Sequence, residues 1–171
     1  MRTYAILLVL WFIPTVGEAT VLLDWQVDDV VAHADSVVIG TVLAQRHVTD
    51  GGRTTTETHV VVHRQLKGVF TGELRLVQLG GHDRERDRIT DVVGAPVLRV
   101  GQEVLLLTQR NPDGRHTLVA MSLGVYYVDG DILWQRIDVP LLERSGALRP
   151  PPGRRAATIA EIEDAIERTS R

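Results

Sequence analysis

A series of short apolar segments separated by glycine-containing turns constrains the fold of this chain more than any other feature. Residues 37–48 are rich in β-branched side chains, and Gly40 within them predicts a bulge or a sharp bend. Residues 103–108 are almost continuously apolar, which is typical of a central strand covered on both faces. The remaining expected strands are 54–66, 74–79, 118–121, 125–128 and 132–134. We therefore predict a mainly β protein, a small closed or partly open barrel of about 5–7 strands with an apolar interior.

Two helices are expected outside the strands. A short N-terminal helix is predicted near Asp24, where apolar residues recur at helical spacing at Val27, Val30, Val31 and Ala34. At the other end, Thr158 and Glu161 match a capping box. The amphipathic stripe that follows is formed by Ile159, Ile162 and Ile166.

The N-terminal residues have the pattern of a secretory signal peptide. Arg2 precedes an apolar run over residues 4–13, and small residues at 17 and 19 fit a cleavage site after Ala19. A retained anchor is the alternative, but ten apolar residues are fewer than the roughly 20 that span a bilayer. We expect an exported protein, periplasmic or extracellular, with no stable membrane anchor after cleavage.

These patterns divide the chain into four parts. A signal peptide is expected over residues 1–19 and a β-barrel domain over 20–139. Residues 140–157 contain three consecutive prolines and predict an extended, proline-rich linker. Residues 158–171 form the expected C-terminal helix.

Charge and cysteine content narrow the possible functions. The formal net charge is -3, which gives no reason to expect nucleic acid or another polyanion as a partner. The chain contains no cysteine, so disulfides, thiol nucleophiles and cysteine metal ligands are excluded. An exported domain of this kind depends on packing alone for its stability.

Polar residues give only weak indications of chemistry. His59 and His63 lie about 13 Å apart along a strand, too far to converge on one ion. His82 and Asp83 are adjacent ligands without further partners. No serine stands in a nucleophile elbow, and no phosphate-binding glycine loop is present. We therefore predict no catalytic, cofactor-binding or metal-binding residue.

One charged stretch is the candidate recognition site. It alternates sign along the chain and lies between two apolar segments, so a solvated hairpin or long loop is expected there. Loops of this kind commonly carry binding function. Its residues are His82, Asp83, Arg84, Glu85, Arg86, Asp87 and Arg88.

Several motifs resemble those of known exported domains. They are DSVVIGTV at 35–42, LKG at 66–68, GG at 80–81, VGAP at 93–96, RVGQEVLLL at 99–107 and LGVY at 123–126. Together they resemble a group of uncharacterised exported bacterial proteins with an OB-fold-like barrel. More remotely, residues 27–128 are similar to netrin-like and metalloproteinase-inhibitor (TIMP-like) domains. The resemblance implies an OB-like barrel and specifies architecture rather than activity.

Departures from those families limit what is carried over. Metalloproteinase inhibitors bind the protease zinc through an N-terminal cysteine, which this chain lacks. Leu98 stands where the bacterial pattern prefers phenylalanine, a change that a core tolerates. The leading hypothesis is an exported non-enzymatic module that binds an envelope or extracellular protein, or a surface. Two alternatives stay open: an envelope metal-dependent hydrolase using His82, Asp83 and His116, and a protease-associated inhibitor or chaperone.

Overall fold

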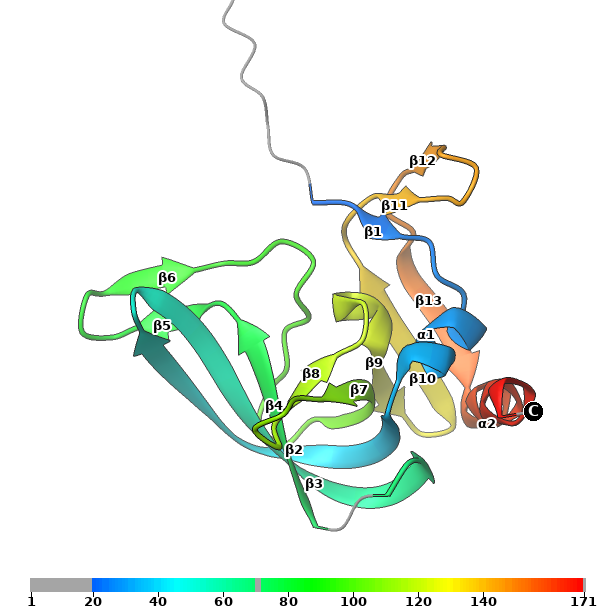
Figure 1. Ribbon diagram of the computed structural model, residues 1–171, viewed down its shortest axis with the longest axis horizontal. Coiled ribbons are helices and arrows are strands. Elements are labelled where there is room, and N and C mark those ends of the chain that lie inside the picture. The colour runs from blue at the N-terminus through cyan, green and yellow to red at the C-terminus, as the bar shows by residue number, and fades with distance from the viewer. Residues whose placement is uncertain (1–19, 70–71, 171) are drawn as a thin grey trace, which may run out of the picture.

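The computed structural model describes residues 20–69 and 72–170, and Figure 1 shows how the elements are arranged. The predicted signal peptide, residues 1–19, lies outside the described residues. The elements in chain order are β1 (Leu22–Leu23), α1 (Val27–His33), β2 (Ser36–Asp50), β3 (Arg53–Lys67), β4 (Glu73–Leu79), β5 (Gly81–Asp83), β6 (Arg88–Thr90), β7 (Glu103–Arg110), β8 (His116–Leu118), the 3-10 helix η1 (Met121–Gly124), β9 (Val125–Asp129), β10 (Ile132–Ile137), β11 (Leu141–Leu142), β12 (Leu148–Arg149), β13 (Gly153–Thr158) and α2 (Ile159–Thr169).

The main sheet has eight strands in the order β13-β10-β9-β7-β2-β3-β4-β8. Strand β8 also pairs with β7, so the five strands β7, β2, β3, β4 and β8 curl into a ring. The ring is incomplete, because β8 meets β4 through a single parallel pair, Leu76 with His116. The prediction of a mainly β fold with two flanking helices is confirmed, but the sheet is only partly ringed and does not form a clean barrel.

The centre of the sheet is buried on both faces, because alternate residues of a strand point to opposite sides. In β7, Leu105 and Leu107 belong to the core beneath the helices, whereas Val104 and Leu106 belong to the core inside the ring. All four are fully buried. The sequence prediction that residues 103–108 form a central, two-sided strand is therefore confirmed.

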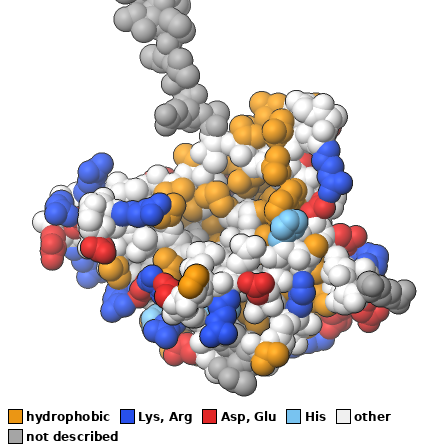
Figure 2. Space-filling view, viewed as in Figure 1, with side chains coloured by type: hydrophobic (Ala, Val, Ile, Leu, Met, Phe, Trp, Pro, Cys, Tyr) orange, Lys and Arg blue, Asp and Glu red, His pale blue; other side chains and the backbone are white. Residues whose placement is uncertain are grey.

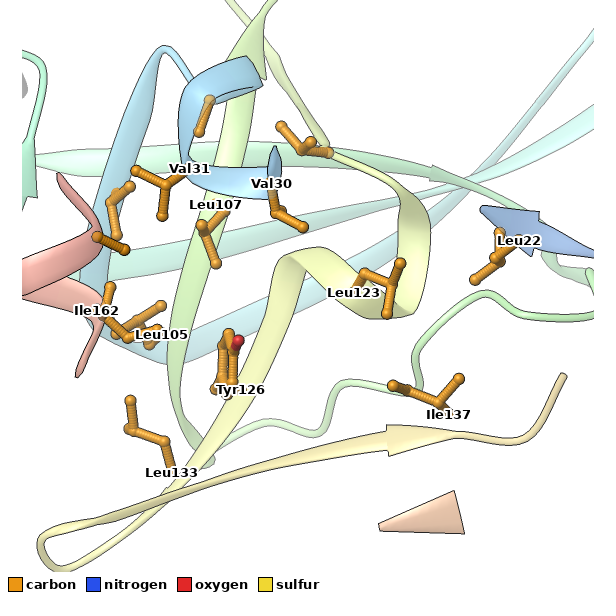
Figure 3. Packing of buried hydrophobic residues seen from close by; sticks show 14 of the residues in the cluster. Leu22, Val30, Val31, Leu105, Leu107, Leu123, Tyr126, Leu133, Ile137 and Ile162 are labelled. Atoms are coloured by element: carbon orange, nitrogen blue, oxygen red, sulfur yellow. The ribbon is translucent and has the colours of Figure 1, made fainter. Parts of the chain in front are cut away.

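The helical layer covers one face of the extended part of the sheet. Val30 and Val31 of α1 pack with Ile162 of α2 over the core that contains Leu105 and Tyr126 (Figure 3). Thr158 accepts a hydrogen bond from the backbone N–H of Glu161, whose carboxylate accepts one from the backbone N–H of Thr158. The predicted capping box is thus present, and it begins the amphipathic helix at the predicted residue.

The interior of the ring is not purely apolar. Thr58 and Thr108 are fully buried, and the Oγ1 of Thr108 lies 3.0 Å from the Nδ1 of the buried His116. Burial is the main cause that lowers the pKa of His116. The expected all-apolar interior is wrong at this end of the ring, where hydrogen bonds satisfy the polar groups.

Residues 140–157 differ from the linker that their composition predicts. They contain β11, β12 and β13, and β13 pairs with β10 along its whole length, from Gly153 to Thr158. Prolines 150–152 lie between β12 and β13, where a missing backbone N–H costs no ladder hydrogen bond. The residues after them are free to extend the sheet.

Another difference concerns the expected strand at 118–121. Strand β8 ends at Leu118, and Ala120 and Met121 have positive φ values that turn the chain into η1. A side chain at Gly124 would clash with the backbone oxygen of Val119, so only glycine fits this close return.

Candidate functional site

One end of the molecule projects from the ring as an arm. We define the arm as the outer parts of β2 and β3, residues 44–50 and 53–59, together with the β5–β6 hairpin over 81–90. Strands β2 and β3 pair there from Ala44 with His59 to Asp50 with Arg53. Figure 1 shows that the arm lies on the side away from α1 and α2. None of the helices in the described part of the chain covers it.

The predicted recognition loop is an ordered hairpin within this arm. Residues 81–83 pair with 88–90, and the turn between them contains residues 84–87. Asp83 is only 6% exposed and accepts hydrogen bonds from the backbone N–H groups of Glu85 and Arg86 at 3.1 and 3.3 Å. Its other carboxylate oxygen accepts one from the Arg86 guanidinium at 3.0 Å. Asp83 therefore holds the turn.

The electrostatics of Asp83 agree with that structural role. Burial opposes its ionisation, but the hydrogen bonds from Arg86 and from the backbone outweigh it and lower its pKa. The carboxylate is thus ionised at neutral pH and already engaged. His82 lies beside it, yet its Nε2 is 3.2 Å from the carboxylate of Asp87 instead.

The hairpin separates two hollows with different linings. One has a volume of about 410 Å³ and lies between the hairpin and β2; its walls include Arg46, His47, Arg84 and Glu85. The other, of about 490 Å³, lies between the hairpin and the β2–β3 turn. Its charged lining residues are Arg53, Asp83, Arg86 and Arg88. Arg84 and Glu85 of the alternating run thus line the first hollow, whereas Arg86 and Arg88 line the second.

Several apolar residues remain exposed on β4, on β6 and in the loop after β6, and one of them, Ile89, belongs to the arm. We define the ridge as Leu79, Ile89, Val93, Val97 and Val21, five apolar residues that remain exposed. Ile89, Val93 and Val97 are 74%, 57% and 71% exposed. Figure 2 shows apolar side chains gathered over the loop that follows β6 and over the region of β1 and β11.

The loop that carries Val93 and Val97 is held firmly. Leu98 is buried in the ring core, and the side chain of Gln78 donates to the Pro96 oxygen at 3.1 Å. The Tyr127 hydroxyl donates to the Val97 oxygen at 3.2 Å. Valines 93 and 97 are therefore displayed outward from a loop that is anchored beneath them.

The other candidate chemical residues do not converge. His59 pairs with Glu73 and His63 with the hydroxyl of Thr41, so each strand histidine has a partner of its own. His82 and His116 line different hollows. Among residues 20–69 and 72–170, no three histidine, aspartate or glutamate residues lie close enough to hold a metal ion.

A hollow of about 390 Å³ lies between the two helices and β13, and it includes Tyr126 and Gln135. Burial raises the pKa of Tyr126 to about 12, so its hydroxyl stays protonated at neutral pH. The side chain of Gln135 donates to the Leu123 oxygen. The nearby Ser122 hydroxyl is buried without a hydrogen-bond partner, so no base activates it. Among the described residues, the lining of this hollow contains no serine or histidine, and its carboxylates are those of Asp28, Glu161 and Asp164.

Comparison of the chain with models of protein families finds no match. A search of curated proteins finds no matching relative either. In the part of the chain that the structure describes, no helix has the length and apolar character needed to span a bilayer. Neither comparison therefore indicates a function for this chain.

Sequence reasoning located the hairpin but missed the ridge. The ridge residues are apolar, as the core residues are, and single apolar residues in a loop give no periodic signal. Only the fold separates Leu98, which points into the ring, from Val93 and Val97, which point outward.

Proposed function

We propose that this chain is an exported, non-enzymatic module of OB-like topology that binds a protein partner through the arm and the ridge. The observation that carries the proposal is the ridge itself: exposed apolar side chains, two of them on an anchored loop, at a charged hairpin. Soluble proteins seldom expose contiguous apolar surface unless another molecule covers it. A polar rim around an apolar centre is typical of protein interfaces.

Strand order supports the OB-like assignment. Around the ring the order is β2-β3-β4-β8-β7, a Greek-key arrangement of five strands with an incomplete closure. OB-folds use the loop between their first and second strands as a binding loop. In this chain that loop is the β2–β3 turn, at the tip of the arm.

Export is part of the proposal and is supported by the N-terminal pattern. The positive start, the apolar run and the small residues before Ala19 fit a secretory signal. The absence of cysteine is compatible with an oxidising compartment, because no thiol is available to form unwanted disulfides. The proposed partner is accordingly an envelope or extracellular protein.

Photo-crosslinking in the native host tests the proposal. A photoreactive amino acid replaces Ile89 on the ridge, and in a matched control it replaces Ile132, which is 46% exposed on β10. We expect a discrete protein adduct from position 89 and none from position 132. Equal adducts from both positions, or none from position 89 with the protein present and folded, would contradict the proposal.

A further inference from the structure

The buried acidic residue of the hairpin, Asp83, is engaged within it, whereas two arginines beside it have no carboxylate partner among the described residues. Asp83 binds Arg86 and two backbone N–H groups, and Asp87 lies beside His82. Within the described residues, neither Arg53 nor Arg88 has a side-chain hydrogen bond or ion pair with a carboxylate. The β2–β3 hairpin and strand β6 therefore each contribute an arginine without a carboxylate partner in the described part of the chain, Arg53 and Arg88.

That charge faces one hollow. The 490 Å³ hollow between the hairpin and the β2–β3 turn is lined by Arg53, Arg86 and Arg88, with Asp83 as its one carboxylate. Three guanidinium groups against one carboxylate leave two positive charges in excess. Glu85 does not line this hollow and lies on the other side of the hairpin.

The geometry of these arginines suits a carboxylate. Guanidinium groups bind carboxylates through paired N–H donors, and such charge-assisted hydrogen bonds are stronger than neutral ones. Arg86 is oriented by its bond to Asp83, and Arg53 approaches from the β2–β3 turn. An incoming carboxylate would therefore meet donors from two separate hairpins.

The same hollow has an apolar side. Leu79 and Val92 line it, whereas Ile89 pairs with His82 and faces the other side of the hairpin. The hollow thus adjoins the ridge at Leu79. A ligand that covers both needs an apolar group next to an acidic one.

We infer that this hollow receives a carboxylate of the protein partner, from an acidic residue that neighbours an apolar residue lying on the ridge. The inference rests on the proposed function and specifies the chemistry of the partner. A nucleic acid fits less well, because the excess charge is local and the whole chain is net negative.

Peptide binding followed by backbone NMR tests the inference. The probe is an acetylated and amidated hexapeptide of alternating leucine and glutamate; the comparison peptide has glutamine in place of glutamate. We expect the acidic peptide to shift the amide signals of Gly51, Gly52 and Gly80 and to bind at least about tenfold more tightly than the glutamine peptide. A titration with sodium sulfate in place of the peptide measures the amide shifts that a free anion causes by itself.

A paired variant and a matched control assign the effect to residues. Arg53→Gln with Arg88→Gln should weaken the acidic peptide by about tenfold or more, whereas Arg75→Gln, an exposed arginine on β4, should leave it unchanged. Equal affinity for the two peptides, an unaffected paired variant, or signal changes away from the hollow would each overturn the inference.

The same variants separate this inference from the proposed function. If the paired variant still forms the adduct at position 89 in the host, the ridge binds its partner without the arginines. The proposed function then stands and the carboxylate site is rejected. Loss of the adduct in the paired variant, with retention in Arg75→Gln, supports both. The thermal midpoint of each variant confirms that it is folded.

Discussion

The two halves of strand β2 lie in different surroundings. From Ser36 to Val42 the strand is flanked by β3 and β7 and is almost entirely buried. From Ala44 to Asp50 it pairs with β3 alone in the main sheet and is largely exposed. A register shift between Val42 and Ala44 marks the boundary, and Leu43 at that point is 56% exposed.

The comparison indicates that the inner half of β2 contributes more to the stability of the fold than the outer half, on which the proposed binding site lies. The inner half contributes to two cores at once, since Val37 and Val38 point to opposite faces. Among the described residues, the outer half belongs to neither core, and β5 packs against it in addition to its partner strand β3. Changes in the arm should therefore alter binding more than folding, and changes in the ring should do the reverse.

The largest expected effect comes from comparing a leucine of the ring core with the exposed leucine at this boundary. Leu106→Ala removes a fully buried side chain from the ring core and should lower the free energy of unfolding by about 3 kcal/mol. Leu43→Ala, at the exposed bulge, should change it by less than about 0.5 kcal/mol. Urea denaturation measures both. Similar losses in the two variants would show that the boundary is misplaced.

A smaller effect is expected where the arm is tied to the ring. Glu57 on β3 binds Arg46 of β2, and it lies 3.1 Å from Arg115 in the turn before β8. The hydrogen bond from Arg46 is the main cause that lowers the pKa of Glu57 below its ordinary value of 4.5. Glu57→Gln should cost about 1 kcal/mol of stability at pH 7.

The stability difference between wild type and Glu57→Gln should also depend on pH. Because the pKa of Glu57 is lower in the folded state, its ionised form contributes stability above the unfolded-state pKa. That contribution is lost as the pH falls through the folded-state pKa. The difference between wild type and Glu57→Gln should therefore shrink below about pH 4. A difference that stays constant or grows in acid would contradict it.

The smallest change in global stability is expected within the hairpin. Asp83→Ala removes the acceptor of three hydrogen bonds and should speed amide exchange in residues 81–90. The free energy of global unfolding should change by less than about 0.5 kcal/mol, because no core residue is disturbed. Glu85→Ala, whose side chain is exposed, is the control that should leave exchange unchanged.

Parts of the difference between the inner and outer halves of β2 could be predicted from the sequence. Gly40 predicted a bend in β2, and the structure has register shifts on both sides of that region. A side chain at Gly40 would lie 2.4 Å from the backbone oxygen of Val61, which explains the glycine physically. The periodic and capping signals of α1 and α2 were also sufficient, because both depend on local spacing.

Other parts depend on contacts that local patterns do not contain. Strand β13 follows three prolines and carries two arginines, so its composition resembles a linker; its pairing with β10 decides its conformation. The burial of Asp83 and His116 likewise depends on distant chain segments. For the candidate site, the charged hairpin was found from its sequence, but the unequal distribution of its charges and the ridge beside it required the fold.

Residue-by-residue hydrogen exchange on the purified protein tests most directly whether the arm opens independently of the ring. We predict that amides of Leu105 and Leu106 exchange only through global unfolding. Amides of Val48 and Thr55 in the arm should exchange through local opening, at a free energy lower by about 2 kcal/mol or more. Equal exchange free energies in the two regions would contradict the account, because the arm would then be part of the same cooperative unit as the ring.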